Sequence, residues 1–232
     1  GRDSARGFPR GSQDRRLGLV VSSRKNKTET GAEKPAAWRE YPEALLVAVL
    51  LAFFIRSFVV QAFKIPSGSM LPTLEIGEHL LVHKYLYGIR VPFVGGRVLD
   101  FKDPERNDVV VFIYPRDRSK DFIKRVVAVG GDTLEVRNKR LFINGEKAED
   151  PFAVYGPDII PRRRSTRDNF GPFSVPEGEV FVMGDNRDAS HDSRLWGTVP
   201  VPEILGKAFV LYWSWDAHAF SPLSSRIGAR IP

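Results

Sequence analysis

The chain has 232 residues, 42% of them hydrophobic and 11% aromatic, enough for one domain of ordinary size with appendages. It contains no cysteine, which excludes disulfides, thiolate metal sites and cysteine nucleophiles. The formal net charge of +7 is compatible with an anionic membrane or nucleic acid as a partner. Length, composition and charge therefore leave the function open.

Most of the positive charge lies at the start of the chain. Residues 1–41 hold ten Lys or Arg and five Asp or Glu, and so carry +5 of the total. They are also rich in Gly, Ser and Pro and have no apolar periodicity. We therefore predict a disordered basic tail over residues 1–41.

An apolar segment follows. Residues 44–55 are twelve apolar residues without a break, and the run continues to Phe63 with three polar interruptions. A bilayer span needs about 20 largely apolar residues, so the run is long enough if Arg56 reaches an interface. We predict one transmembrane anchor over residues 42–62. The basic residues before it predict a cytoplasmic N-terminus and an extracytoplasmic remainder.

Two other interpretations of this segment remain open. It can be a buried helix of a soluble domain. It can also belong to a cleaved signal peptide, because Val60-Gln61-Ala62 has the small-residue spacing of a cleavage site. The long segment before the run and the arginine within it favour a retained anchor.

After the anchor, short runs rich in Val, Ile, Phe and Leu alternate with breaks such as Gly130-Gly131-Asp132 and Asn144-Gly145. This pattern predicts a mainly β domain without long helices. We expect strands at 79–84, 108–114, 122–129, 133–137, 140–143, 179–183 and 207–213.

Residues 146–176 differ from the rest. They hold five prolines and the basic cluster Arg162–Arg164, and show little period-2 pattern. We expect a loop-rich insertion or small cap here, which divides the β core into residues 63–145 and 177–216. Residues 217–232 are then a C-terminal tail.

Ser69 lies in a Pro-Ser-Gly-Ser-Met turn just beyond the apolar segment. Pro66 fixes φ and Gly68 permits unusual backbone geometry, so the turn can present a hydroxyl rigidly. A plain serine-rich turn leaving a bilayer has the same composition, and Ser69 needs a second observation to be a candidate nucleophile.

Lys124 supplies that observation. Period-2 alternation places it on one face of its strand with Phe122, Val126 and Ala128. Lysine is seldom buried without a partner, and burial lowers the pKa of its amine. A neutral amine can take a proton from a serine hydroxyl, whereas an edge-strand lysine reaching solvent cannot. Ser69 with Lys124 is therefore a candidate Ser/Lys pair.

A third segment, Gly184 to Arg194, is densely polar. Its aspartates do not match the EF-hand spacing, and its arginines oppose a cation, so we expect no metal. Ser190, His191 and Asp192 are adjacent, and adjacent residues cannot face one another as a Ser-His-Asp triad. Surface or packing positions are expected for His79, His83, His191 and His218.

Together these segments resemble bacterial type I signal peptidase, a membrane-anchored serine protease with a Ser/Lys dyad. The resemblance covers residues 41–216. Its motifs stand here as Ile65-Pro-Ser-Gly-Ser-Met-Leu-Pro-Thr-Leu74, Asp108-Val-Val-Val-Phe-Ile-Tyr-Pro115, Phe122-Ile-Lys-Arg-Val-Val-Ala-Val-Gly-Gly-Asp132 and Gly184-Asp-Asn-Arg-Asp-Ala-Ser-His-Asp-Ser-Arg194.

The resemblance implies a mainly antiparallel β core with a short cap, and Ser69 as nucleophile with Lys124 as general base. Ser67 would join the oxyanion hole and Ser190 would orient the lysine. The residues implied to support the site are Asp185, Asp192, Arg194 and Arg125.

The substrate implied is an exported preprotein with small residues at the first and third positions before the cut. Phe63, Ile65 and Ile123 are expected to line the substrate pocket. No cofactor is required. The implied location is the cell inner membrane, with the lipid bilayer as a partner and the secretion translocon nearby.

Two rivals from other classes remain. A self-cleaving SOS-repressor-type protease shares the Ser/Lys pair but lacks the anchor and has a DNA-binding domain, and no helix-turn-helix is visible here. A non-enzymatic anchored β module with a basic tail for anionic lipid or nucleic acid needs neither Ser69 nor Lys124. We expect an enzyme, and no nucleic-acid partner.

Overall fold

The computed structural model describes residues 37–55, 59–90, 97–99, 101–161, 163–216 and 221–232. The predicted tail lies outside these residues up to position 36, as do Arg162 and His218. The chain divides into two compact units, Gly1–Glu43 and Ala44–Pro232.

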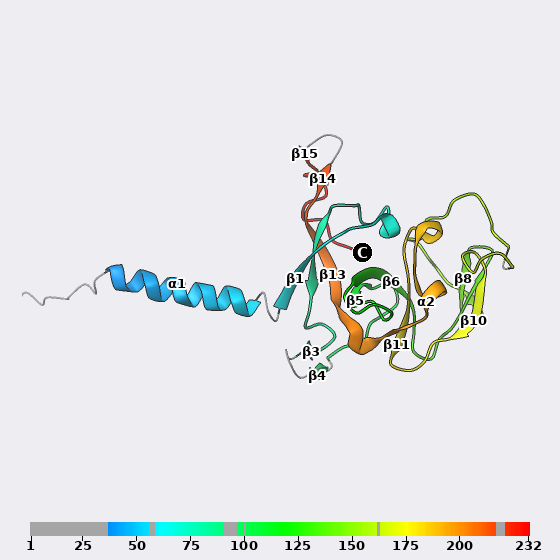
Figure 1. The fold of residues 1–232 in the computed structure, drawn as a ribbon, viewed down its shortest axis with the longest axis horizontal. Helices are drawn as coiled ribbons and strands as arrows, with labels where there is room; N and C mark the ends of the chain where they lie inside the picture. The colour runs from blue at the N-terminus through cyan, green and yellow to red at the C-terminus, as the bar shows by residue number, and fades with distance from the viewer. Residues whose placement is uncertain (1–36, 56–58, 91–96, 100, 162, 217–220) are drawn as a thin grey trace, which may run out of the picture. The chain divides into compact units, whose positions relative to one another are not determined.

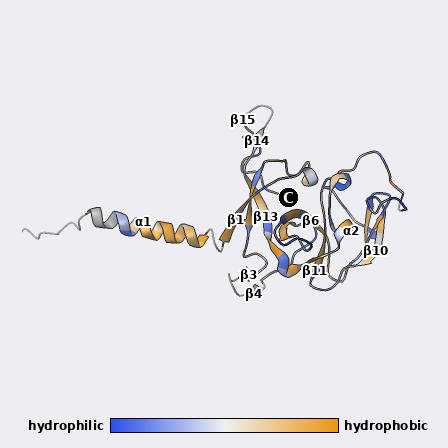
Figure 2. Ribbon diagram, viewed as in Figure 1, coloured by the Kyte–Doolittle hydropathy of each residue, from blue (hydrophilic) through white to orange (hydrophobic). Residues whose placement is uncertain are grey.

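Helix α1 runs from Ala37 to Phe54, and its apolar side chains are exposed. Leu45 is 65% exposed and Phe53 is 68% exposed, and the apolar colouring covers the later turns (Figure 2). Exposed apolar surface of this extent is unusual in water and indicates a partner or a membrane. Among the described residues, no helix is long and apolar enough to cross a bilayer.

The C-terminal boundary of the predicted anchor is wrong. Residues 60–62 belong to strand β1 (Val60–Lys64), which pairs with β2 (His79–His83) from Val60 opposite His83 to Lys64 opposite His79. Val60, Gln61 and Ala62 therefore begin the β domain, because their backbone groups bond to a neighbouring strand rather than within a helix.

One large antiparallel sheet forms the centre of the second unit (Figure 1). Its strand order is β1-β2-β13-β5-β6-β11-β12, and every pair in it is antiparallel. The strands not yet given are β5 (Val109–Ile113), β6 (Asp121–Val129), β11 (Glu179–Met183), β12 (Val199–Pro200) and β13 (Ile204–Trp213).

A second sheet has the order β10-β7-β8-β9. Its hairpin turn at Asn138 and Lys139 has positive φ at both residues, as a type I′ turn requires. Two strands of this sheet, β9 and β10, lie within the predicted insertion, and two, β7 and β8, precede it. The insertion therefore shares a sheet with the part of the predicted β core that precedes it. The strands are β7 (Thr133–Arg137), β8 (Arg140–Ile143), β9 (Glu146–Lys147) and β10 (Phe170–Ser174).

Short elements complete the described fold. Two small sheets pair β3 (Ile89–Arg90) with β4 (Arg97–Leu99) and β14 (Trp215–Asp216) with β15 (Ser221–Pro222). The helical turns are η2 (Gly68–Met70), η3 (Arg187–Ala189), α2 (Ser193–Trp196) and η4 (Val201–Glu203).

The predicted mainly β architecture is confirmed, and all seven expected strands are present, with every end but one within one residue of its predicted position. The exception is β13, which begins at Ile204, three residues early. A side chain at Gly206 would lie 2.2 Å from the carbonyl oxygen of His83. Glycine there allows the two backbones to approach and extends the strand.

Strand β6 departs from the predicted alternation. Its residues are buried without interruption from Ile123 to Ala128, because separate core clusters pack on it. Ile123 joins one cluster, Val126 a second, and Val127 with Ala128 a third. The register with β11 shifts opposite Val126 and Ala128. Val126 and Ala128, which strict alternation places on the same face, therefore pack in different clusters, and the strand is buried on both faces.

The predicted C-terminal tail is wrong over its described part. Ile231 is buried in the same cluster as Ile65 and Ile123, and the Leu211 amide donates to the Ala229 carbonyl at 2.9 Å. The last residues pack back on β13 because one apolar side chain fills a core position. The segment belongs to the β core.

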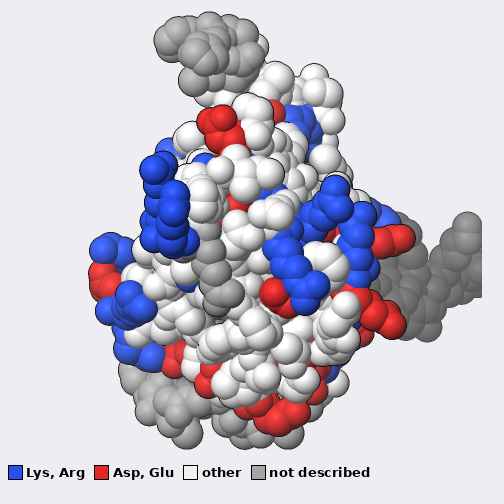
Figure 3. Space-filling model, turned by 90° about the vertical axis from the view of Figure 1, so that its right-hand side faces the viewer, with Lys and Arg blue, Asp and Glu red and all other residues white. Residues whose placement is uncertain are grey.

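The arginine cluster of the predicted cap lies at the surface. Arg163 and Arg164 are both exposed. Figure 3 shows one face of the molecule, with Lys and Arg mixed among Asp and Glu. On the face that Figure 3 shows, Lys and Arg therefore do not form a continuous basic surface.

Candidate active site

The turn that carries Ser69 is held from both ends. The Ile65 amide donates to the backbone carbonyl oxygen of Glu78 at 2.8 Å, and the Gly77 amide donates to that of Ile65 at 2.9 Å. These two bonds close the loop between β1 and β2. Met70 and Leu74 are fully buried. These anchors fix η2, so the Ser69 side chain has a defined position, with 7% of the residue exposed.

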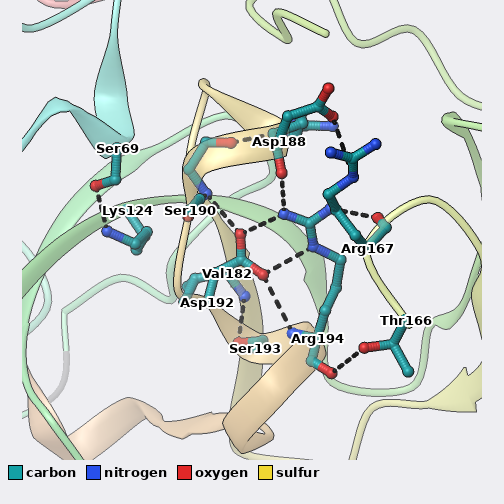
Figure 4. Close-up of polar contacts among 12 residues, drawn as sticks. Ser69, Lys124, Thr166, Arg167, Val182, Asp188, Ser190, Asp192, Ser193 and Arg194 are labelled. Carbon is teal, nitrogen blue, oxygen red and sulfur yellow. Dashed lines mark hydrogen bonds and ion pairs between the residues drawn. The ribbon is translucent and has the colours of Figure 1, made fainter. Parts of the chain in front are cut away.

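Lys124 approaches Ser69 from strand β6, 55 positions later in the chain. Its Nζ donates to Ser69 Oγ at 2.7 Å (Figure 4). The same Nζ donates to the carbonyl oxygen of Ile123 at 2.9 Å. Lys124 is only 4% exposed, and its Nζ lies 5.6 Å from the centre of the Phe122 ring. The amine is therefore almost fully buried, between the Phe122 ring and its two hydrogen-bond partners.

Burial lowers the pKa of Lys124 from 10.5 to about 8, and the negative charges of Asp192 and Asp185 oppose this shift. Desolvation penalises the ammonium form more than the neutral amine. About half of the protein then carries a neutral Lys124 at pH 8. An amine in this state, at hydrogen-bond distance from a hydroxyl, can act as its general base.

The two other serines of the predicted site lie close to this pair. Ser67 Oγ is 3.5 Å from Ser69 Oγ. Ser190 Oγ accepts from the Gly184 amide at 3.2 Å, and none of the hydrogen bonds recorded for the described residues joins it to Lys124. Its predicted role in orienting the lysine stays a prediction.

Arg125, next to the lysine, forms a fully buried ion pair with Asp185. Its Nε and Nη2 donate to the two carboxylate oxygens at 2.8 Å each, and both residues are inaccessible to solvent. Thr73 Oγ donates to Asp185 at 2.6 Å. This bidentate pair ties β6 and the segment after β11 to the chain that follows Ser69.

A second buried ion pair, between Arg194 and Asp192, lies near the lysine (Figure 4). Arg194 donates from Nε and Nη2 to the Asp192 carboxylate at 2.9 and 2.8 Å, and the Gly184 amide donates to the same carboxylate at 3.2 Å (Figure 4). A side chain at Gly184 would lie 2.4 Å from both Ser190 Oγ and the Ser69 carbonyl oxygen. Glycine is thus required by the close approach of this loop to the Ser69 turn.

Three contacts near the site were not predicted from the sequence. Arg187, fully buried, pairs with Asp150 of the predicted cap. Lys139 donates to Asp188 at 2.7 Å. Asn186 bonds to the Ser69 turn. Arg187, Asp188 and Asn186 lie inside the recognised Gly184–Arg194 motif, which could have signalled them, but nothing in the sequence indicates their partners.

A cleft of about 570 Å³ opens over Ser69 and Lys124. Phe63 and Ile65 line it from β1 and its end, and Ile123 lines it from β6. His191, which is exposed, also borders it. Among the described residues, no three His, Asp or Glu side chains are grouped so as to hold a metal ion.

The family model described as "Signal peptidase, peptidase S26" matches residues 38–213. A signal peptidase I from Pseudomonas fluorescens is 39% identical, with 82% of this chain and 78% of that protein covered. A signal peptidase I from Aquifex aeolicus is 33% identical, with 77% and 85% covered. A crystal structure of a signal peptidase I from Enterococcus faecalis is 30% identical, with a TM-score of 0.38 over 47% of this chain and 98% of that one.

The family match covers more than half of the chain, and the relatives match over most of it. The resemblance inferred from the four motifs is therefore confirmed, and with it the expectation of an enzyme. The chain belongs to the signal peptidase family, peptidase S26, and is a serine endopeptidase of that family.

Proposed function

We propose that this protein is a membrane-anchored endopeptidase that removes signal peptides from exported preproteins, with Ser69 as nucleophile and Lys124 as general base. The observation that carries the proposal is the 2.7 Å contact between Lys124 Nζ and Ser69 Oγ, with both residues buried beneath the cleft. A buried lysine whose amine bonds to a serine hydroxyl serves no evident packing purpose.

Neutral Lys124 takes the hydroxyl proton as Ser69 Oγ attacks the scissile carbonyl carbon. The same amine then gives the proton to the departing amine of the substrate, and the acyl-enzyme forms. A water molecule gives a proton to the neutral lysine and attacks the ester carbonyl carbon. Lys124 returns that proton to Ser69 Oγ as the acyl C–O bond breaks, and the signal peptide leaves with a free carboxyl group. Proton and electron balance is complete without a cofactor.

The negative charge on the tetrahedral oxygen needs hydrogen-bond donors. In our proposal these are the Ser69 amide and the Ser67 hydroxyl, and removal of one such donor costs hydrolases about 3–4 kcal/mol. Ser190 orients the lysine in this scheme. The buried pairs of Arg125 with Asp185 and of Arg194 with Asp192 hold the site in shape without touching the substrate.

Two open strand edges support an extended substrate. Among the described residues, β1 pairs on one side only, with β2, and β6 pairs with β11 from Arg125 onward. Among the described residues, Phe122–Lys124 of β6 have no partner strand on the side opposite β5, and they border the cleft. A peptide strand can bond to these edges irrespective of its sequence. Small side chains before the cut then fit between Phe63, Ile65 and Ile123.

We further propose that the segment containing α1 anchors the protein in the cell inner membrane, with a cytoplasmic N-terminus and an extracytoplasmic β core. The exposed apolar side chains of α1 support this placement. The anchor would hold the site at the bilayer surface, where signal peptides leave the secretion translocon.

The test uses the full chain, solubilised in detergent, and a preprotein whose signal ends in Ala-X-Ala. Cleavage after the second Ala by the parent, and by neither Ser69→Ala nor Lys124→Met, is expected. Lys120→Met is a matched control, because this lysine is on the exposed side of the same region and pairs with Asp117. Cleavage that survives in Lys124→Met overturns the general-base assignment. No cleavage by a folded parent protein overturns the proposed function.

A further inference from the structure

Asn186 bonds to two consecutive carbonyl groups of the nucleophile turn. Its backbone amide donates to the Ser69 carbonyl oxygen at 3.1 Å, and its side-chain Nδ2 donates to the Gly68 carbonyl oxygen at 3.2 Å. Asn186 also borders the cleft. Because a carbonyl oxygen can only accept, the NH₂ end of the Asn186 amide must face Gly68.

The Gly68 carbonyl belongs to the same peptide unit as the Ser69 amide. A peptide unit is planar and trans, so its C=O and N–H point in opposite directions. Fixing the direction of the Gly68 oxygen thus fixes the direction of the Ser69 N–H. A hydrogen bond accepted by the oxygen also polarises the unit and makes its N–H a stronger donor.

The Gly68 oxygen has a second donor, the Leu71 amide at 3.2 Å. With Nδ2 of Asn186, both acceptor positions of this oxygen are used. None of the hydrogen bonds recorded within the described residues uses the Ser69 amide. The donor end of this peptide unit remains available to a substrate, while its acceptor end is held twice.

Asn186 is itself held rigidly. The Val154 amide donates to the backbone carbonyl oxygen of Asp185 at 2.7 Å, and the Arg187 amide donates to that of Val154 at 3.0 Å. This β-bridge holds the backbone on both sides of Asn186. The Ala189 amide donates to the Asn186 carbonyl at 3.1 Å. The buried pair of Asp185 with Arg125 completes the support.

We propose that Asn186 is a positioning residue of the oxyanion hole, which aims and polarises the Ser69 amide through the Gly68 carbonyl. The proposal rests on the proposed function, in which the Ser69 amide binds the tetrahedral oxygen. Asn186 touches neither the proton path nor the scissile bond. Asn186 therefore stabilises the transition state and does not contribute to substrate binding.

The test replaces Asn186 by Leu, which has a similar size and no donor, and by Ala. Both variants keep the backbone bond to Ser69. We expect kcat to fall about 10- to 100-fold, somewhat less than for loss of a whole donor, with KM changed by less than about twofold. Asn169→Leu is the matched control, since its Nδ2 also donates to a carbonyl, that of Ile160 at 3.3 Å, and it should retain parental kcat.

Three readouts separate this role from a general loss of structure. A peptide aldehyde that forms a tetrahedral adduct on Ser69 should bind the Asn186 variants more weakly, in proportion to kcat. A peptide blocked by proline after the cleavage position, which forms no adduct, should bind as well as to the parent. The pH at which the rate is half-maximal should not change, because the Lys124–Ser69 contact is intact.

Unchanged kcat in Asn186→Leu would overturn the inference. So would equal weakening of both inhibitors, which indicates a distorted pocket, or a displaced pH profile, which indicates an effect on Lys124. Failure of the proposed function has a different signature, because the parent protein would then cleave no preprotein or Ser69→Ala would remain active.

Discussion

Replacing Lys124 by methionine should change the stability of the fold in a pH-dependent way. The side chain is 4% exposed and its amine is protonated below pH 8 even though it is buried. An ammonium in such an environment destabilises the folded state. Methionine has a similar length and carries no charge, so Lys124→Met removes this penalty together with the hydrogen bonds to Ser69 and Ile123.

The size of the penalty follows from the pKa. The shift is from 10.5 to about 8, and each unit corresponds to about 1.4 kcal/mol, which gives about 3 kcal/mol. Because the folded pKa lies below the unfolded one, the unfolded state binds more protons between pH 8 and 10.5. The penalty is thus complete below pH 8, falls as the pH rises, and vanishes above 10.5. Each lost hydrogen bond costs about 1 kcal/mol at every pH.

Lys124→Met should therefore be more stable than the parent at pH 7, by about 1 kcal/mol, and less stable at pH 10. The assay is urea unfolding of the full chain in mild detergent at both pH values, compared between parent and variant. Lys120→Met is the control, because Asp117 raises the pKa of Lys120 and no change between pH 7 and 10 is expected. A Lys124→Met difference that is the same at both pH values would refute the reasoning.

Three further outcomes are expected. In the parent, kcat/KM for a signal-peptide substrate should rise with pH to a plateau, with a half-maximum near the Lys124 pKa of about 8, because only the neutral amine is a base; a flat profile from pH 6 to 9 would contradict this. Arg125→Met and Asp185→Leu should each lower the free energy of unfolding by about 3–5 kcal/mol, since each leaves a buried partner unpaired. The double variant with both substitutions should lose less than the sum of the two single losses in urea unfolding. Gly184→Ala should lower kcat at least about tenfold, because the new methyl group meets the Ser69 carbonyl oxygen at 2.4 Å; parental activity in that variant would show that the loop can move at little cost.

The sequence alone was sufficient for the class of fold and for the family. Alternating apolar runs and glycine-rich breaks place strands such as Thr133–Arg137 and Glu179–Met183 correctly, because side-chain periodicity and turn chemistry are local properties. The four motifs are read directly from the residues, and they identify the family and the candidate pair Ser69 and Lys124.

The boundaries between segments were harder to predict from the sequence. The predicted anchor includes residues 60–62 because Val and Ala suit a membrane helix as well as a strand. The residues around Ile231 were assigned to a tail, since one apolar residue among polar ones carries no periodic signal. In both cases the deciding factor is a distant strand, β2 or β13, whose hydrogen bonds local sequence cannot reveal.

Tertiary structure alone decided the chemical state of the site. Burial lowers the pKa of Lys124, and this burial depends on the packing around β6, which side-chain alternation along one strand does not specify. The bonds of Asn186 to Gly68 and Ser69 join residues more than a hundred positions apart, and so does the bond between Thr73 and Asp185. Desolvation and hydrogen-bond direction depend on what surrounds a group in space, and a sequence specifies the group but not its surroundings.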